Sequence, residues 1–548
     1  MSAAAVHSLW TTAAEPIAKI DAPKIEYGQL SPTLIVIGAA LVGVLIEAFV
    51  PRKSRYYTQV FVSVVALAAA FAAVVAMAAA DTGRRRHTSR RWARSPSTGP
   101  PCSCRARSCW RASSVSSPSP SALDPEAHGN RVDSFAAQAA SVPGSDSEKA
   151  AVKAGFTTTE VFPLLLFAIG GMLVFPSAND LLTLFIALEV FSLPLYLLCA
   201  VARRKRLMSQ EAAVKYFLLG AFASAFTLFG IALLYGYAGS VSYARIAQVV
   251  DGTVTNVDPA LAGTMGNDVL LLIGAAMVVM GLLFKVGAVP FHMWTPDVYQ
   301  GAPTPVTGFM AAATKVAAFG ALLRLLYVVL PGLRWDWRPV MWAVAIVTML
   351  GGAIVAITQT DIKRLLAYSS IAHAGFILAG VIAASPDGVS SVLFYLAAYS
   401  FVTIGAFAVV TLVRDAGGEA THLSKWAGLG RRSPLVAAVF AVFLLAFAGI
   451  PLTSGFAGKF AVFKAAAEGG AGALVVVGVI SSAIAAFFYI RVIVLMFFSE
   501  PKPEGPTVAV PSPLTMTAIA FGVAVTLVLG VAPQYFLDLA SQAGVFVR

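Results

Sequence analysis

The chain has 548 residues, of which 58% are hydrophobic and only 12% charged, and its formal net charge is +12. Soluble globular domains are about 45–50% apolar and about 25% charged, so this composition excludes an ordinary soluble protein and indicates an integral membrane protein. The apolar segments are about twenty residues long, which is the length of a membrane-spanning helix, and they lack the short alternating pattern that is typical of a membrane β-barrel.

We count thirteen such segments along the chain, and the sixth and the eleventh are interrupted internally. The sequence therefore predicts an all-α, polytopic membrane protein with about 13–14 transmembrane helices. The predicted spans lie at 31–50, 58–80, 160–176, 179–201, 212–238, 268–290, 304–331, 340–359, 362–384, 388–413, 434–467, 472–499 and 511–535.

Lysine and arginine cluster between the predicted spans in four places, at residues 52–55, 203–206, 361–364 and 414–432. Basic residues concentrate in the cytoplasmic loops of membrane proteins. These four loops are therefore predicted to lie inside and the N-terminus outside. The same rule assigns the excess positive charge to membrane topology rather than to nucleic-acid binding.

The first two basic loops are separated by three predicted spans, although loops on the same side require an even number. The missing span is expected within residues 82–130, a stretch rich in Arg, Ser and Pro that contains Cys102, Cys104 and Cys109 but no lysine. A disordered basic loop is one interpretation, and a metal site is another, although a fourth ligand is lacking. We favour a third, a compensated frameshift in a GC-rich gene, because it explains both the composition and the missing span.

Several ionisable residues lie inside the predicted spans, where each costs about 2.5–3.5 kcal/mol on the insertion scale. Burial disfavours the charged form of a lysine and a nearby carboxylate restores it, so acids and bases at similar depth on separate helices are typical of a proton relay. A side chain that reaches the membrane surface remains an alternative for Lys215, and a structural histidine remains one for His373. The candidate relay residues are Glu189, Lys215, Lys285, Lys315, His373 and Lys459.

Two prolines are predicted to break helices beside buried lysines. Pro290 follows Lys285, and Pro451 precedes Lys459; each proline removes a backbone donor. Unwound backbone is tolerated inside a membrane where protein or water satisfies it. The two breaks are five spans apart, so the second unit should run in the opposite direction to the first, which predicts an inverted repeat of two five-helix units, as in transporters.

The predicted organisation has five parts. Residues 1–81 form an N-terminal polar segment and the first two spans, and residues 82–159 form the aberrant segment and a loop. Residues 160–331 form the first five-helix repeat, 340–499 the second, inverted repeat, and 500–548 a C-terminal loop and the last span.

Three stretches resemble a known family: KVGAVPFHMWTPDVYQGAPTPV, TDIKRLLAYSSIAHAGF and IPLTSGFAGKF. They are similar to the antiporter-like membrane subunits of respiratory complex I, the proton-pumping NADH–quinone oxidoreductase. The resemblance covers roughly residues 160–500, and Tyr299-Gln300-Gly301 resembles the N-type rather than the L- or M-type subunits. Mrp-type cation/proton antiporter subunits are the alternative, and the buried charges disfavour a purely structural scaffold.

This resemblance implies a role for each candidate residue. Glu189 would be the glutamate near the neighbouring subunit, and Lys215 a lysine of the helix that follows it. Lys285 would be the lysine of the first broken helix, and Lys315 the connecting lysine one helix later. His373 would be a polar residue of the central axis, and Lys459 the exit-side lysine of the second broken helix. The resemblance pairs the glutamate with the lysine of the first broken helix and places the histidine on the central axis.

The resemblance also implies fourteen spans and no NADH, flavin or iron–sulfur cluster bound by this chain. NADH and quinone would be used by the whole complex, and the partners would be its other membrane subunits and the lipid bilayer. The location implied is the bacterial inner membrane. Residues 82–130 depart from the family pattern, because the third span should lie there.

Overall fold

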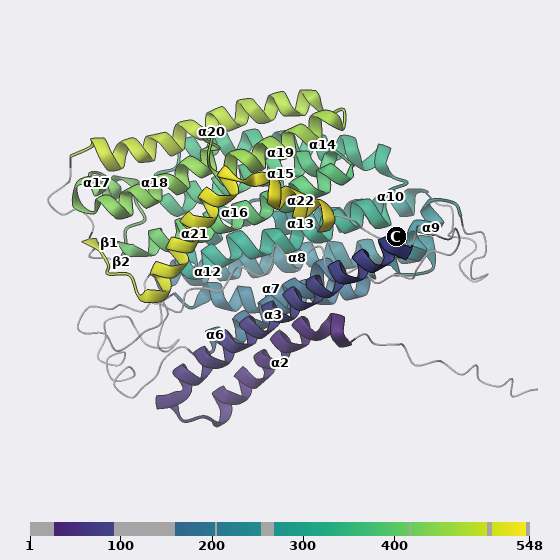
Figure 1. The fold of residues 1–548 in the computed structure, drawn as a ribbon, viewed down its shortest axis with the longest axis horizontal. Coiled ribbons are helices and arrows are strands. Elements are labelled where there is room, and N and C mark those ends of the chain that lie inside the picture. Colours follow the sequence, from purple (N-terminus) through teal and green to yellow (C-terminus); the bar gives the residue numbers. More distant parts are fainter. Residues whose placement is uncertain are drawn as a thin grey trace, which may run out of the picture.

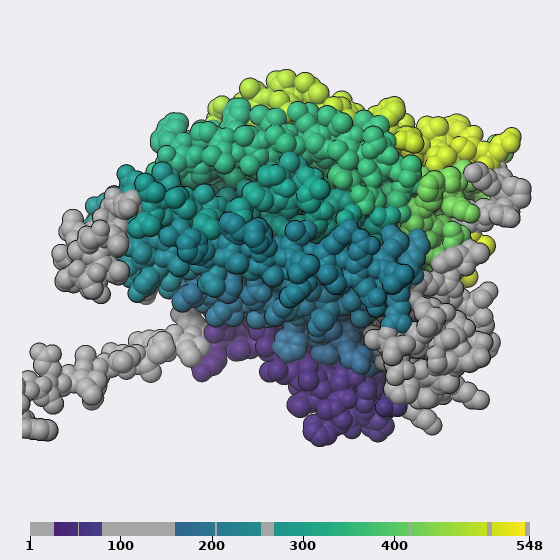
Figure 2. Space-filling model, turned by 180° about the vertical axis from the view of Figure 1, so that it is seen from behind, coloured from purple at the N-terminus to yellow at the C-terminus, as the bar shows by residue number. Residues whose placement is uncertain are grey.

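The computed structural model describes residues 27–91, 159–202, 205–253, 268–415, 418–500 and 507–543. The expectations for residues 92–158, which include the three clustered cysteines, lie outside the described residues. Figure 1 shows an elongated bundle of helices, and Figure 2 shows that the chain runs across it, from the purple N-terminal helices at one side to the yellow C-terminal helices at the other.

The first half of the bundle contains the two N-terminal helices and the first broken helix. Its elements are α2 (Tyr27–Phe49), α3 (Arg52–Arg91), α6 (Val161–Val174), the 3-10 turn η3 (Phe175–Ser177), α7 (Leu181–Ala200), α8 (Arg206–Ala238), α9 (Tyr243–Val250), α10 (Asp268–Val286) and α11 (Trp294–Gly301).

The second half begins with a helix that contains two π-helical turns. Its helices are α12 (Thr304–Phe309), π-turn η5 (Met310–Thr314), α13 (Lys315–Arg324), π-turn η6 (Leu325–Val329), α14 (Arg334–Ile357), α15 (Ile362–Ile382), α16 (Pro386–Leu412), η7 (Leu423–Trp426), α17 (Leu429–Arg432), α18 (Pro434–Ala448), α19 (Ser454–Glu468), α20 (Gly472–Phe498), α21 (Pro513–Val531) and α22 (Pro533–Ala543). A small sheet of β1 (Val413–Asp415), β2 (Gly418–Glu419) and β3 (Thr507–Val508) has the order β2-β1-β3.

Within the described residues, eleven helices are long and apolar enough to cross a membrane. Two shorter apolar helices, Val161–Ser177 and Pro434–Ala448, match the remaining predicted spans. The prediction of an all-α, polytopic membrane protein is confirmed.

Helices α13 and α15 form the centre of the bundle, since every residue of α13 and nearly every residue of α15 is buried. Small residues let the helices around them approach closely. A Cβ atom on Gly352 of α14 would lie 2.6 Å from the backbone nitrogen of Ala372, and one on Gly375 of α15 would lie 2.7 Å from that of Met349. An ionisable side chain on α13 or α15 therefore faces protein rather than lipid.

Three of the four basic loops meet at one end of the bundle, at the left in Figure 1. Lys205 Nζ donates to Thr421 Oγ1 at 3.0 Å, and Asp361 forms a β-bridge with His422. We call this end, with residues 205, 361–364, 413–415 and 418–432, the basic end. Its assembly from separate loops agrees with their predicted location on one side of the membrane.

Helices α3 and α6 both begin at the same end. The rings of Tyr56 and Phe162, near the two N-termini, have centroids 5.9 Å apart. The end of α3 lies across the bundle from there (Figure 1). The C-terminal end of α3 and the N-terminal end of α6 therefore lie at opposite ends of the bundle.

The two helix breaks follow one pattern, and glycine rather than proline ends each helix. Helix α10 ends four residues before Pro290, where Gly287 has a φ of +77°, and α18 ends before Gly449, with a φ of +83°. In each break the glycine N–H donates to the carbonyl three residues back, and the next N–H donates to the one five residues back. This is a Schellman cap, which proline commonly follows. The predicted breaks are present, but Pro290 and Pro451 lie just beyond the helix ends.

The second break is packed too tightly for a side chain at Gly455. A Cβ atom there would lie 1.7 Å from the carbonyl oxygen of Ala446. We expect Gly455→Ala to destabilise the protein by about 1–3 kcal/mol, the usual range for overpacking. A lower melting temperature and less assembled protein in detergent would show this loss. Gly472→Ala is the control, because a Cβ atom there meets nothing within 4 Å; equal stability of the two variants would contradict the expectation.

Candidate functional site

Lys285 lies in the last turn of α10 and is buried. Its ammonium donates to Ser192 Oγ on α7 at 2.7 Å. The rings of Phe191, Tyr196 and Tyr216 surround the ammonium, with centroids 5.2, 5.5 and 5.4 Å from Nζ. Aromatic faces attract a cation, so this site can hold a charged lysine without a carboxylate in direct contact.

Glu189 lies one turn before Ser192 on α7, and its Oε1 is buried with no hydrogen-bond partner in the described part of the chain. The carboxylate acts on Lys285 electrostatically, but no ion pair joins the two side chains among the described residues. Ser192, rather than Glu189, is the direct hydrogen-bond partner of Lys285. Sequence reasoning missed this serine, because nothing in the local pattern distinguishes it from other helix serines.

Lys315 is the first residue of α13 and follows the π-turn η5. Its ammonium donates to the carbonyl oxygens of Val286, at 3.2 Å, and Ser370, at 2.6 Å. Val286 is the last residue of α10, so its carbonyl is one of those that a helix end leaves without an intrahelical partner. Lys315 thereby joins the first broken helix to α15.

His373 lies in the middle of α15 and is buried. Its Nδ1 is 2.7 Å from the hydroxyl oxygen of Tyr395, and its Nε2 is 3.3 Å from that of Tyr489. Because both partners can donate or accept, either tautomer of the imidazole can be hydrogen-bonded. The tyrosines come from α16 and α20, so the histidine connects three helices.

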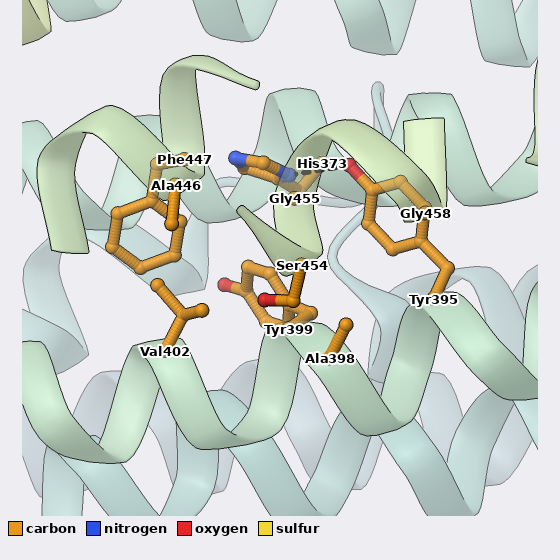
Figure 3. Close-up of a pocket in the computed structure, with 10 residues that line it drawn as sticks. All are labelled: His373, Tyr395, Ala398, Tyr399, Val402, Ala446, Phe447, Ser454, Gly455 and Gly458. Carbon is orange, nitrogen blue, oxygen red and sulfur yellow. Dashed lines mark hydrogen bonds between the residues drawn. The ribbon is translucent and has the colours of Figure 1, made fainter. Parts of the chain in front are cut away.

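A small cavity lies against His373 and is drawn in Figure 3. It leaves about 10 Å³ for the centre of a water molecule, which is room for about one. Ser454 and Tyr399 are among the residues that line it. The Ser454 hydroxyl is buried without a hydrogen-bond partner among the described residues, so a water molecule here would satisfy it and would lie beside the imidazole.

Lys459 projects from α19 back to the end of α18. Its ammonium donates to the carbonyl oxygens of Phe447 and Ala448, each at 2.9 Å, and to Ser482 Oγ at 2.8 Å. The C-terminal end of a helix carries partial negative charge. The end of the second broken helix thus supplies acceptors for a buried ammonium.

These buried groups form a continuous series of neighbours. Lys315 contacts the carbonyl of residue 286, next to Lys285, and also that of residue 370, one turn before His373. The imidazole in turn packs 5.4 Å from the ring of Phe447, whose carbonyl accepts from Lys459. The structure therefore brings four of the six candidate residues into one buried row.

Lys215 lies apart from this row, near the basic end. Its side chain is 43% exposed and forms ion pairs with Glu211 at 2.7 Å and Asp297 at 2.9 Å. Asp297 also accepts from Arg364 at 2.7 Å. The lysine therefore belongs to a surface network that holds α11 against α8 and α15.

Arg324 is a buried cation at the end of α13 and contacts the turn between α6 and α7. Its Nη1 donates to the carbonyl oxygen of Pro176 at 3.1 Å and its Nη2 to Asn179 Oδ1 at 2.6 Å. The ring of Tyr243 on α9 lies 5.6 Å from its guanidinium. Burial raises the pKa of the Tyr243 phenol, so the ring stays neutral beside the cation. Arg324 holds the turn between α6 and α7 against α13.

In the part of the chain that the structure describes, no three His, Cys, Asp or Glu side chains are grouped as metal ligands would be. Cys199 is a buried free thiol.

Comparison with known proteins assigns the family. Residues 178–485 match the family model described as NADH:quinone oxidoreductase/Mrp antiporter, transmembrane. The chain is 79% identical to NADH-quinone oxidoreductase subunit N 3 of Streptomyces griseus, over 100% of both chains. The chain belongs to the NADH-quinone oxidoreductase subunit N family. This membership agrees with the resemblance found in the sequence.

Solved structures of related complexes share the fold of this subunit N family member. A chain of respiratory complex I from Thermus thermophilus is 29% identical, with a TM-score of 0.68 over 92% of this chain and 98% of that one. A chain of the Mrp complex from Dietzia has a TM-score of 0.72 over 95% and 97% of the two chains, at 22% identity; this likeness concerns the fold alone. This chain is therefore a multi-pass protein of the bacterial plasma membrane.

Proposed function

We propose that this chain translocates protons as subunit N of an NADH–quinone oxidoreductase complex, through Glu189, Lys285, Lys315, His373 and Lys459. The observation that carries the proposal is the buried row of lysine and histidine side chains between two broken helices. Each member of that row can gain and lose a proton, and each has a hydrogen-bond partner inside the protein. Lys215 joins the relay only as a surface group at the basic end.

The chemistry follows from the partners of each lysine. Helix-end carbonyls favour the ammonium form of Lys315 and Lys459, and the aromatic rings favour that of Lys285. A change in the position of one charge alters the stability of the next, because electrostatic interactions are strong where water is excluded. Protons can then move one step at a time, with His373 as the group between Lys315 and Lys459.

In this proposal the redox reaction takes place in other subunits. NADH, quinone and the redox cofactors bind outside this chain, which contributes the proton route through the membrane. Its partners are the other membrane subunits of the complex and the lipid. Helix α7, which carries Glu189, exposes large apolar side chains on its outer face, at Leu182, Ile186, Leu193 and Leu197, and a neighbouring membrane subunit or lipid covers such a face.

We further propose that residues 160–331 and 340–499 are the two inverted repeats. The shared Schellman caps at Gly287 and Gly449 support this division. So does the lysine that donates to the last carbonyls of each broken helix.

The alternative is an Mrp-type cation/proton antiporter subunit, because the Dietzia chain has the same fold. The high identity to a named subunit N favours the complex I assignment. Sodium dependence of transport without NADH would favour the antiporter instead.

Lys315→Met tests the function. Removing a proton-transfer group slows the step through it by about 10² or more, so NADH-driven acidification of membrane vesicles should fall to background. The redox activity with an artificial acceptor should remain. Lys464→Gln is the control, since Lys464 has a 63% exposed side chain. Full acidification by the Lys315→Met complex would refute the proposed relay.

A further inference from the structure

Lys363 is a buried lysine that the proposed relay does not use. It is the second residue of α15 and is only 2% exposed, although it belongs to a basic cluster that the sequence assigns to a loop. Its ammonium donates to the carbonyl oxygen of Ala302 at 2.7 Å. Its neighbour Arg364 instead pairs with Asp297 in the half-exposed network. The two adjacent cations therefore occupy different environments.

The geometry of Lys363 matches that of two relay lysines. Ala302 follows the last residue of α11 and caps that helix. Each of three buried lysines therefore donates to a carbonyl at the C-terminal end of an interrupted helix. These pairs are Lys315 with Val286 at the end of α10, Lys363 with Ala302 at the end of α11, and Lys459 with Ala448 at the end of α18.

Four titratable groups act on Lys363. Asp361 lies on its own helix, Glu419 on β2, Lys205 just before α8, and Cys199 on α7. Glu419 is half-buried at the basic end and accepts a hydrogen bond from the Thr304 hydroxyl. Thr304 is two residues from Ala302, the acceptor of Lys363, so Glu419 lies near the lysine. Asp361 caps α15 by accepting from the N–H of Lys363, while the Cys199 thiol is buried.

A route leads inward from Lys363 along α15. Ser370 is seven residues further on, so it lies on the same helix face, about 10 Å deeper. Its carbonyl accepts from Lys315. Its hydroxyl is buried beside the phenols of Tyr299 and Tyr399. The Lys315 ammonium lies 5.9 Å from the centroid of the Tyr399 ring, so hydroxyl groups continue from this serine toward Lys315.

We propose that Lys363 is the proton-loading residue at the basic end of this chain, which takes up protons through Glu419 and passes them toward Lys315. The Glu419 carboxylic acid gives its proton to the neutral Lys363 amine, which leaves a carboxylate and an ammonium. The ammonium then releases a proton inward and returns to the amine, while a hydronium ion at the basic end reprotonates Glu419 and becomes water. This inference rests on the proposed function, since it supplies the relay with its protons.

The Lys363→Arg variant distinguishes proton uptake by Lys363 from its hydrogen bond to the Ala302 carbonyl. Arginine keeps a positive charge and donors for the Ala302 carbonyl but does not release its proton. We expect normal assembly and normal redox activity with an artificial acceptor, with pumping at least about tenfold lower because a proton-transfer group is lost. Lys464→Arg, the same exchange at an exposed site, should pump normally. A Lys363→Arg complex that pumps like wild type at every pH would overturn the proposal.

Glu419→Gln is the second variant, and it tests proton uptake at the basic end even if Lys363 variants fail to assemble. Glutamine keeps an acceptor for Thr304 but carries no exchangeable acid proton. Pumping should therefore decline at a lower pH than in wild type as protons become scarce at the basic end. An unchanged pH profile would overturn the loading route. If Lys315→Met stops pumping while Lys363→Arg and Glu419→Gln do not alter it, only this inference fails; if Lys315→Met also has no effect, the proposed function fails.

Discussion

Lys285→Ala is expected to abolish NADH-driven proton pumping while leaving the complex assembled. The substitution removes the ammonium held by Ser192 and by the rings of Phe191, Tyr196 and Tyr216. It also leaves Glu189 without its counter-charge. The loss of one proton-transfer group slows transfer by about 10² or more, and a coupled enzyme should lose quinone reduction together with pumping.

Glu189→Ala should also abolish proton pumping in an assembled complex, in this case because the negative charge near Lys285 is lost. Its carboxylate acts on Lys285 across space rather than through an ion pair, so the mutation changes the lysine's proton affinity and removes no hydrogen bond to it. The NADH-driven proton gradient in membrane vesicles measures pumping by both variants. Glu468→Gln is the control, because that acid is 56% exposed and lies outside the relay. Normal gradients in both Lys285→Ala and Glu189→Ala would exclude these residues from the relay.

Lys459→Arg is expected to abolish proton pumping as completely as Lys459→Ala. Arginine remains protonated under all working conditions, so it could replace a fixed charge but could not release a proton. The side chain is also confined, because a Cβ atom at Gly449 would lie only 3.0 Å from Lys459 Cδ. Assembly should therefore be checked alongside pumping.

The comparison of the two variants distinguishes charge from proton release. Full pumping by assembled Lys459→Arg would show that Lys459 acts as a fixed charge. Loss in both variants, with assembled complex present, would support release of its proton.

The sequence predicted the spans and the breaks well, because both are local. Spans depend on the length of an apolar segment, and breaks on nearby glycine and proline. The proline was nevertheless given the role that glycine performs at residues 287 and 449. Both residue types mark a helix end, and only the backbone conformation shows which residue leaves the helix.

The surroundings of the lysines could not be predicted, since their partners are distant in the chain. Lys315 donates to a carbonyl 29 residues away and Lys363 to one 61 residues away. Lys215 and Lys363 show how burial depends on such distant partners. Lys215 was predicted as a relay residue, with a side chain that reaches the surface as the alternative, and its side chain is 43% exposed. Lys363 was assigned to a basic loop and is buried.

The helix-end carbonyls have a consequence for how the chain can change during evolution. Carbonyl oxygens belong to the main chain, so the residues that supply them, Val286, Ala302, Phe447 and Ala448, contribute no side-chain atom to the hydrogen bonds with the lysines. Another residue of similar size at these positions would present the same acceptor. Selection on the acceptors must therefore act through the residues that end the helices. An ordinary comparison of side chains would pass over most of the hydrogen-bond acceptors of these three lysines.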